Sequence, residues 1–189
     1  MLLPPLILRN IKIRVFLKAS LNPFTETDIN HIKEFGNFES KHHHQIIRLK
    51  NLYVFTVYKY SRNFINVTGL KSKIEITNIH HIIDKVFNAS IKEIRIENMT
   101  FSRKVRNMSF SSEKILKLIC SQDLKVFKFD KTLEGFHAPW IRSKYGSFNL
   151  FATGSVTVVG VSCFKNIKII EKYLDHIYCP ESFIKTLTE

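Results

Sequence analysis

The feature of this sequence that most constrains its fold is a pattern of two strands and a long helix that occurs twice. In residues 148–177, apolar and polar side chains alternate on both sides of Thr153-Gly154-Ser155, and an amphipathic segment follows Gly160. Residues 53–87 repeat this arrangement about ninety positions earlier. Alternation with a period of two predicts strands, and glycine supplies the positive φ that a tight turn needs. Such a long period indicates duplication of a domain rather than a solenoid.

Further positions correspond between the two copies at spacings of 88 to 94 residues. The corresponding pairs are Asn10 with Asn98, Arg48 with Arg142, Tyr60 with Phe151 and Gly69 with Gly160. We expect one copy at residues 8–88, a second at 91–178, and a loose tail at 179–189. Each copy should contain a strand, a helix, further strands and a long helix. The chain is therefore predicted to be an α+β protein, in which a continuous antiparallel sheet carries four helices on one side and is open on the other.

The individual elements follow from periodicity and capping signals. We expect strands at 10–17, 42–50, 53–60, 64–69, 94–105, 124–130 and 137–144, followed by the hairpin described above. Helices are expected at 25–35, 73–87 and 111–119, and the last helix should end at Cys179-Pro180. Thr25 and Asp28 have the spacing of a helix start. Residues 61–63 are expected to form a turn, with Asn63 in the left-handed conformation.

The charge of the chain suggests an anionic partner. It carries 29 Lys and Arg against 16 Asp and Glu, a formal net charge of +13, which exceeds what solubility needs. Nucleic acid is the first candidate and a membrane surface the second, and the charge is spread over both copies. Three cysteines without a close pair argue against a disulfide framework or a zinc site and fit a reducing compartment. The apolar residues 1–8 are too short to span a membrane, and we expect no signal peptide.

The run His42-His43-His44 raises the question of a metal site. Neighbouring side chains of a strand point to opposite faces, so at most His42 and His44 could share a metal, and no third ligand is apparent. We therefore expect no metal and no cofactor. The sequence contains no Ser/His/Asp or Cys/His arrangement, no Gly-rich phosphate loop and no pair of carboxylates on one strand, so we expect no enzymatic activity.

The ordered motifs of the second copy resemble the C-terminal repeat of the TATA-box-binding protein family. Residues 136–142, Phe-His-Ala-Pro-Trp-Ile-Arg, keep the first Phe and the Arg of the family's Phe-Pro-Gly-Leu-Ile-Tyr-Arg. Residues 151–155 and Val159-Gly160 keep the frame of the family's following hairpin. The first copy is similar at residues 60–64 and 67–69, although it is more degraded. The likeness covers residues 8–178.

The resemblance implies a pseudo-twofold saddle whose concave sheet lies on the minor groove of DNA. In that family, two aromatic pairs wedge between base steps at the ends of the bound site. The matching pair in the second copy is Phe136 and Phe151, and the matching positions of the first copy hold His42 and Tyr60. Alternation places Phe151 on the face opposite the core residues Phe148 and Leu150. We therefore expect Phe151 to lie on the open face.

The resemblance also assigns further DNA-binding positions. Asn10 and Asn98 match the central pair that hydrogen-bonds base edges in the minor groove. The positions that match the groove-facing floor of the family's sheet are Lys12, Asn66, Thr68, Thr100, Thr157 and Val159. The expected phosphate contacts are Arg48 and Arg142. Lys144 is a further candidate, but it is equally well explained as a solvated charge. The first copy thus presents a more polar and more basic floor. We hypothesise asymmetric binding, in which the second copy wedges while the first holds phosphates electrostatically.

The resulting functional hypothesis is a transcription initiation factor that binds the minor groove of A·T-rich promoter DNA, bends it and nucleates recruitment of RNA polymerase. Glu134 matches an acidic position through which the family recruits a TFIIB-like factor. The nucleus or a viral transcription site would be the expected location, without membrane association. Two alternatives stay open: a protein-interaction saddle that has lost DNA binding, and a substrate-recognition module of a nucleic-acid enzyme. Salt-dependent binding to A·T-rich duplex would separate the first hypothesis from a protein-interaction role.

Overall fold

A computed structural model describes residues 4–49, 52–105, 127–130, 140–151 and 153–178, and it divides the chain into two compact units. The first unit is Asn10–Asn98, and the second unit combines Met1–Arg9 with Met99–Glu189. The strands β1 (Ile7–Leu17) and β6 (Ile91–Lys104) each contribute residues to both units. None of the described helices is long and apolar enough to cross a membrane.

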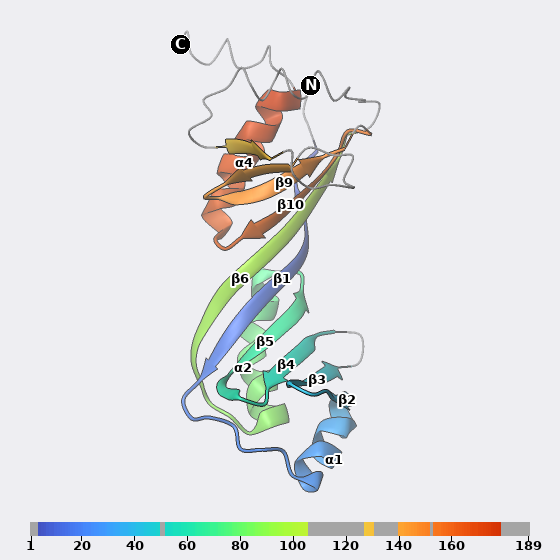
Figure 1. Cartoon of the computed structure of the whole chain (residues 1–189), viewed down its shortest axis with the longest axis vertical. Helices are drawn as coiled ribbons and strands as arrows, with labels where there is room; N and C mark the ends of the chain where they lie inside the picture. The colour runs from blue at the N-terminus through green and yellow to red at the C-terminus, as the bar shows by residue number, and fades with distance from the viewer. Residues whose placement is uncertain (1–3, 50–51, 106–126, 131–139, 152, 179–189) are drawn as a thin grey trace. The chain divides into compact units, whose positions relative to one another are not determined.

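The first unit is an antiparallel sheet with helices on one face (Figure 1). Its strands are ordered β2-β3-β4-β5-β1, and the 91–98 part of β6 lies next to β1. The remaining elements of this unit are α1 (Glu26–Phe35), β2 (Gly36–Ser40), β3 (His44–Leu49), β4 (Val54–Tyr58), β5 (Ser61–Leu70) and α2 (Lys73–Phe87). The predicted core face of β1 is confirmed, because Ile11, Ile13 and Val15 are fully buried. They lie in the same core as Ile79 and Ile83 of α2.

Short polar side chains define the helix ends of the first unit. Thr25 caps α1 as predicted: its Oγ1 accepts from the Asp28 amide at 3.2 Å, and the Asp28 carboxylate accepts from the Thr25 amide at 2.8 Å. The hydrogen bonds from Thr25 lower the pKa of Asp28 below its usual value. Ser72 caps α2, since its Oγ accepts from the Glu75 amide at 3.2 Å, and Asn88 ends that helix in the left-handed conformation.

The second unit repeats the arrangement of a sheet with a helix on one face. Its strands are ordered β6-β10-β9-β8-β7, with β7 (Phe127–Asp130), β8 (Trp140–Ser143), β9 (Gly146–Leu150) and β10 (Ser155–Val161), and α4 (Phe164–Tyr178) follows. The predicted β9–β10 turn is confirmed, since Gly154 has a φ of 77°. Phe148 and Leu150 are buried together with Ile170 and Leu174 of α4, which also confirms the predicted core face of this hairpin.

Two polar contacts bind α4 to the sheet of the second unit. Arg103 of β6 is only 3% exposed, and its guanidinium donates to Asp175 at 2.6 Å and lies 3.7 Å from Glu171. The hydroxyl of Tyr178 donates to the Gly154 carbonyl at 2.9 Å. Burial raises the pKa of Tyr178 to about 12, so its hydroxyl stays protonated in neutral solution.

Several sequence predictions of local structure are wrong. The strand Gly36–Ser40, which begins at the C-cap of α1, was not predicted, and His42 and His43 lie in the turn before β3 rather than in the strand. The turn between β4 and β5 is at Lys59-Tyr60, because Tyr58 pairs directly with Ser61. Arg62 accounts for this turn, since its Nε donates to the Lys59 carbonyl at 3.3 Å.

Two further predictions concern single side chains. Asn63 does not adopt the left-handed conformation: among the described non-glycine residues, only Asn88 has a positive φ. In the last helix, which was predicted to be amphipathic, Ile169 is exposed because it lies beside the buried stripe of Ile170, Leu174 and Ile177. The predicted helix at 111–119, residues 124–126 of the predicted strand and the tail at 179–189 lie outside the described residues. The pseudo-twofold axis and the saddle shape stay predictions.

Candidate nucleic-acid interface

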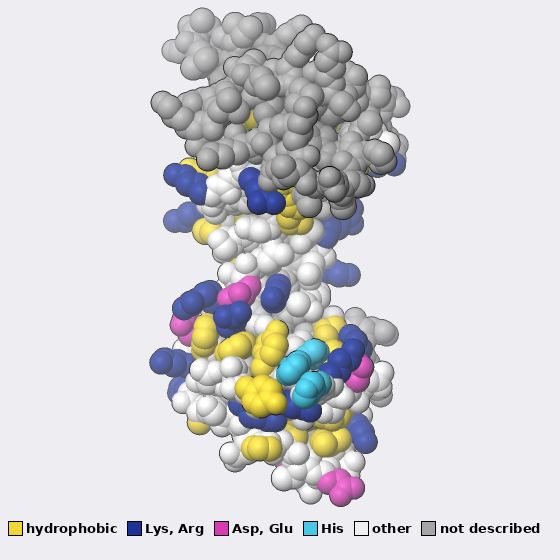
Figure 2. Space-filling model, in the orientation of Figure 1, with side chains coloured by type: hydrophobic (Ala, Val, Ile, Leu, Met, Phe, Trp, Pro, Cys, Tyr) yellow, Lys and Arg dark blue, Asp and Glu magenta, His cyan; other side chains and the backbone are white. Residues whose placement is uncertain are grey.

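Each unit has one sheet face that its described helices leave open, and several of the predicted site residues lie on these two faces. In the first unit, the open face is formed by the side chains that alternate with the buried ones, such as Lys12 and Arg14 between Ile11, Ile13 and Val15. Figure 2 shows hydrophobic, histidine and basic side chains lying side by side on this face of the first unit. Thr68 and Arg48 lie on it in one directly paired row, with Val54 of β4 between them.

Asn10 is held in one orientation at the start of the first unit. Its side-chain Oδ1 accepts from the Gly69 amide at 2.8 Å. A backbone amide can only donate, so the oxygen of the Asn10 amide must face Gly69 and the Nδ2 group must point elsewhere. Gly69 has a φ of 100°, which favours glycine at the position that presents this amide. The two Nδ2 hydrogens take no part in this hydrogen bond.

Arg14 is the centre of a polar cluster on the open face of the first unit. Its Nε donates to Oδ1 of Asn66 at 3.3 Å, and its Nη2 lies 3.2 Å from Oε2 of Glu97. The guanidinium carbon is also 4.7 Å from the centroid of the Phe64 ring. Asn66, predicted as an accessible floor residue, is only 5% exposed, because Arg14 and Tyr58 cover it. At this place on the open face, a ligand would meet the side chains of Arg14 and Tyr58 rather than Asn66.

Four rings form a row across this face, which we call the aromatic row: His44 of β3, Tyr58 of β4, Phe64 of β5 and Phe16 of β1. Successive ring centroids are 6.1 Å, 5.8 Å and 6.1 Å apart. Arg95 reaches the end of the row, with its guanidinium carbon 5.1 Å from the centroid of Phe16. The sequence reasoning missed this row, although strand alternation already placed Phe16 on the open face. The sequence pattern that could have revealed the row is an aromatic residue on the open face of each of several neighbouring strands.

The residues that match the first predicted wedge lie together at the tips of two hairpins. Tyr60 is 79% exposed in the β4–β5 turn, and His42 and His43 are exposed in the β2–β3 turn. His43 lies between the other two, with ring centroids 4.2 Å from His42 and 6.3 Å from Tyr60. The structure thus brings His42 and Tyr60 to one place, and it adds a third ring to them.

The open face of the second unit has a different character. A directly paired row runs across it through Ser102 of β6, Thr157 of β10, Asn149 of β9 and Trp140 of β8. Arg9 lies at the start of this row, where its Nε donates to Oγ of Ser102 at 2.6 Å. The row between Arg9 and Trp140 contains no charged residue. Small uncharged side chains let a ligand approach the backbone of this sheet closely.

Asn149 of β9 is another residue of the open side that is not accessible. It faces away from the core but is only 6% exposed, because it lies between its directly paired neighbours Thr157 and Trp140. Its Oδ1 and the Nε1 of Trp140 are buried without a hydrogen-bond partner among the described residues.

The other predicted residues of the second unit are placed as follows. Phe151, Thr157, Val159 and Thr100 are partly exposed on the open side, and Arg142 is exposed on β8 with its guanidinium carbon 6.0 Å from the Trp140 ring. Asn98, the last residue of the first unit, is partly exposed on β6. Phe136 and Glu134 lie outside the described residues. The roles assigned to these side chains stay predictions.

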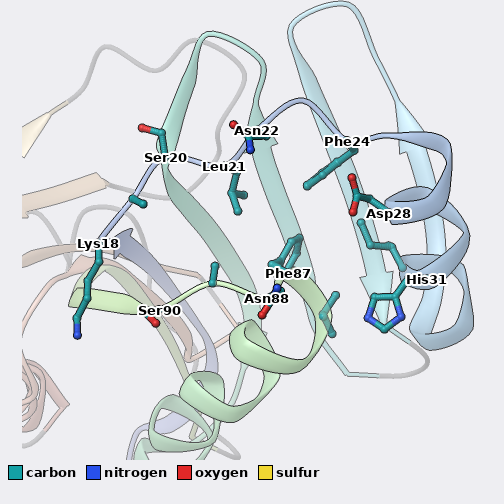
Figure 3. Close-up of a pocket in the computed structure, with 14 residues that line it drawn as sticks. Lys18, Ser20, Leu21, Asn22, Phe24, Asp28, His31, Phe87, Asn88 and Ser90 are labelled. Carbon is teal, nitrogen blue, oxygen red and sulfur yellow. The ribbon is translucent and has the colours of Figure 1, made fainter.

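A cavity of about 510 Å³ lies on the helix side of the first unit, between the loop after β1, α1 and the end of α2. Figure 3 shows Asp28 and His31 of α1 in this cavity together with Phe87 and Asn88. The Asp28 carboxylate is used in the helix cap, and Nε2 of His31 lies 3.1 Å from the Lys85 carbonyl. The two titratable side chains that α1 contributes to this cavity, Asp28 and His31, therefore both contact other groups of the protein. Across the described part of the chain, no group of His, Cys, Asp and Glu could hold a metal.

The two open faces, backed by helices, can be compared with known structures. A solved structure titled Methanococcus jannaschii TBP matches with a TM-score of 0.63 and 17% identity, over 93% of this chain and 99% of that one. The fold is TBP-like. The predicted resemblance is thereby confirmed for the TBP-like fold. No family model matches the sequence, and no curated protein matches it.

Other solved structures are far less similar. A crystal structure of A. aeolicus tRNASec in complex with M. kandleri SerRS matches with a TM-score of 0.42 and 9% identity, over 93% of this chain and 30% of that chain. A rolling circle replication initiator protein from Geobacillus stearothermophilus matches with a TM-score of 0.40 and 10% identity, over 90% of this chain and 79% of that one.

Proposed function

We propose that this chain is a non-enzymatic protein that binds double-stranded DNA in the minor groove. The observation that carries the proposal is the uncharged pair Ser102 and Thr157, with the buried Asn149 next to them, on the open face of a TBP-like sheet with Arg9 beside it. The minor groove is narrow and presents base edges at its floor, so a protein surface that reads it needs small side chains. The basic residue beside the row would contact a phosphate.

Asn10 supports the same proposal from the first unit. Its Nδ2 group is a donor held in place by the Gly69 amide. In the minor groove, A·T pairs present only the acceptors N3 of adenine and O2 of thymine, whereas G·C pairs add the N2 donor of guanine. A fixed donor therefore favours A·T pairs. The net charge of +13 would supply the salt-dependent part of the affinity.

The finer parts of the proposal concern transcription. We infer that the bound DNA is A·T-rich promoter DNA, that Phe151 and Phe136 wedge into it and bend it, and that the complex recruits a TFIIB-like factor and RNA polymerase. The nucleus or a viral transcription site is the proposed location. These statements extend the sequence resemblance, and each depends on binding to duplex DNA.

The test uses three fluorescein-labelled duplexes of equal length that contain A·T, G·C or I·C pairs. Inosine lacks the N2 amino group, so an I·C duplex presents the same kinds of groups in the minor groove as A·T but differs from it in the major groove. Fluorescence anisotropy at two salt concentrations should give similar affinities for A·T and I·C and a weaker one for G·C. Equal affinities for I·C and G·C, or no binding at low salt, would contradict the proposal.

A pair of matched variants locates the interface. Thr157→Glu places a carboxylate in the centre of the uncharged row and should weaken duplex binding at least about tenfold, through phosphate repulsion and steric exclusion. Thr77→Glu makes the same change on the exposed surface of α2, on the helix side of the first unit, and should weaken binding no more than about twofold. Equal losses in both variants would mean that the open face of the second unit is not the interface.

A further inference from the structure

The open face of the first unit has features that binding of a duplex groove does not explain. Where the second unit has Ser102, Thr157 and Asn149, the first unit presents a guanidinium and the rings of the aromatic row. Tyr58, Phe64 and Phe16 are all at least partly exposed on a face that no described helix covers. Rings of this size would hold base edges away from the backbone of the sheet. An exposed cluster of apolar rings also marks a surface that contacts a ligand.

The aromatic row and its two arginines together leave planar surfaces available for stacking. Neighbouring rings are inclined to each other by 53°, 49° and 54°, so none of them is stacked flat on the next ring in the row. Arg14 lies over Phe64, and Arg95 lies over Phe16. Guanidinium planes stack with bases as aromatic rings do. The row with its two arginines therefore offers several planar surfaces across the strands β3, β4, β5 and β1.

Arg14 is fixed before any ligand arrives. Asn66 accepts from its Nε, Glu97 pairs with its Nη2, and Phe64 supports the plane. A side chain held by three partners loses little conformational entropy on binding, which makes a planar contact with it more favourable. Since the Glu97 carboxylate offsets part of its charge, the planar surface of Arg14 is its more available feature.

The charge of the first unit selects the kind of ligand. Residues 10–98 contain 14 Lys and Arg against 8 Asp and Glu. On the open face, Lys12 follows the same alternation as Arg14, and Arg48 lies on the same face of β3 as His44, further along the strand. An apolar protein partner or a neutral lipid surface would not need these cations. A chain with flat apolar groups on an anionic backbone satisfies both features, and an unpaired nucleic-acid strand is such a chain.

We propose that the open face of the first unit binds single-stranded nucleic acid, whose unpaired bases stack on the aromatic row and its two arginines. This site is distinct from the uncharged row of the second unit, and it needs no duplex binding. Stacking tolerates every base, because each base has a π-face, so little sequence preference is expected. The sugar is identified by the test below, since the stacking chemistry is common to DNA and RNA.

The first experiment changes the ligand and leaves the protein intact. Anisotropy is measured with the whole chain and fluorescein-labelled oligothymidylate of about 20 nucleotides, long enough for several stacked bases. The comparison strand is an abasic oligonucleotide of the same length and backbone charge. Binding to the oligothymidylate should be at least about tenfold tighter, and equal binding would overturn the proposal because it would show backbone attraction alone. An oligouridylate of the same length shows whether the 2′-hydroxyl is preferred.

The second experiment changes the protein. Phe64→Leu keeps an apolar side chain but removes the ring, and it should weaken oligothymidylate binding about tenfold while the salt dependence stays the same. Phe35→Leu is the matched control, because Phe35 is a partly exposed ring on α1, outside the sheet, and it should have no effect. Arg95→Lys keeps the charge and removes the plane, and it should weaken binding severalfold.

The outcome of this test is independent of duplex binding. Thr157→Glu should bind oligothymidylate nearly as well as the unchanged chain, so failure of the duplex proposal leaves this one standing. Tyr58 is the most exposed ring of the aromatic row. Tyr58→Leu therefore provides a second variant if Phe64→Leu does not fold. Equal affinities of Phe64→Leu, Tyr58→Leu and the unchanged chain for oligothymidylate would overturn the proposal.

Discussion

The amide of Asn10 has two separable roles, and one pair of substitutions distinguishes them. Its Oδ1 accepts from the Gly69 amide at 2.8 Å, which stabilises the first unit, and its Nδ2 group is the proposed donor to base edges. Asn10→Ala removes both groups. Asn10→Asp keeps an oxygen opposite the Gly69 amide and replaces the donor by a carboxylate oxygen.

The two variants should rank in opposite order for stability and for DNA affinity: Asn10→Ala should be the less stable, and Asn10→Asp should bind duplex DNA more weakly. A lost hydrogen bond to a partly buried amide costs about 1 kcal/mol, so Asn10→Ala should lower Tm by about 3 °C in a chain of this length. Asn10→Asp retains the acceptor and should leave Tm within about 1 °C. For duplex DNA, Asn10→Ala should lose about 1 kcal/mol, or fivefold in Kd. Asn10→Asp should lose about 2 kcal/mol or more, since its charge opposes both base acceptors and phosphates.

The assay combines thermal melting by circular dichroism with fluorescence anisotropy on an A·T-rich duplex. Asn78→Asp, on the exposed surface of α2, makes the same charge change on the helix side and should alter Kd no more than about twofold. The reasoning predicts that Asn10→Asp is the more stable of the two Asn10 variants and the weaker DNA binder. If Asn10→Ala were the weaker binder, or if Asn78→Asp reduced affinity equally, the proposed donor role would be refuted.

Other predictions concern stability alone. Gly69→Ala should cost more than Gly160→Ala by about 1 kcal/mol in urea denaturation, because both have positive φ but only the Cβ at Gly69 would meet a backbone oxygen, at 2.8 Å. Asp175→Ala should lower the free energy of unfolding by about 2 kcal/mol, since it leaves the buried guanidinium of Arg103 with only the more distant carboxylate of Glu171. Arg103→Met removes the buried charge as well, and its free energy of unfolding should stay within about 1 kcal/mol of the unchanged chain. The raised pKa of Tyr178, about 12 against 10.0 unfolded, contributes stability that is complete below pH 10 and lost as the pH rises to 12, and Tyr178→Phe should flatten this part of the stability curve.

Much of the fold could be predicted because its long elements carry strong local signals. The strict alternation of β1 predicted its buried face, and the capping residue Thr25 predicted the start of α1. The bounds of α2 were predicted as observed. In contrast, β2 is only 5 residues long, and its one buried residue is a glycine, so it carries no apolar alternation to detect.

The accessible surface of the open faces could not be predicted in the same way. Alternation places Asn66 and Asn149 on the open side correctly, but both are buried there. Their burial depends on which side chains lie opposite them on neighbouring strands: Arg14 and Tyr58 cover Asn66, and Trp140 lies beside Asn149. This register is a tertiary property, and a single sequence does not contain it explicitly.

The register also explains how two similar sheets come to have different open faces. In the second unit, Thr157 of β10 is paired with Ser102 on one side, and in the first unit Asn66 of β5 is paired with Arg14 on the corresponding side. Where the second unit has Ser102, the first unit has Arg14, whose side chain covers the sheet surface at Asn66. The guanidinium of Arg14 presents a plane there and lies over the ring of Phe64. Small side chains permit close approach to base edges, whereas planes above the sheet favour base faces. The proposed difference between duplex and single-strand recognition therefore depends on a few side chains per strand, while the order of the strands corresponds in the two units.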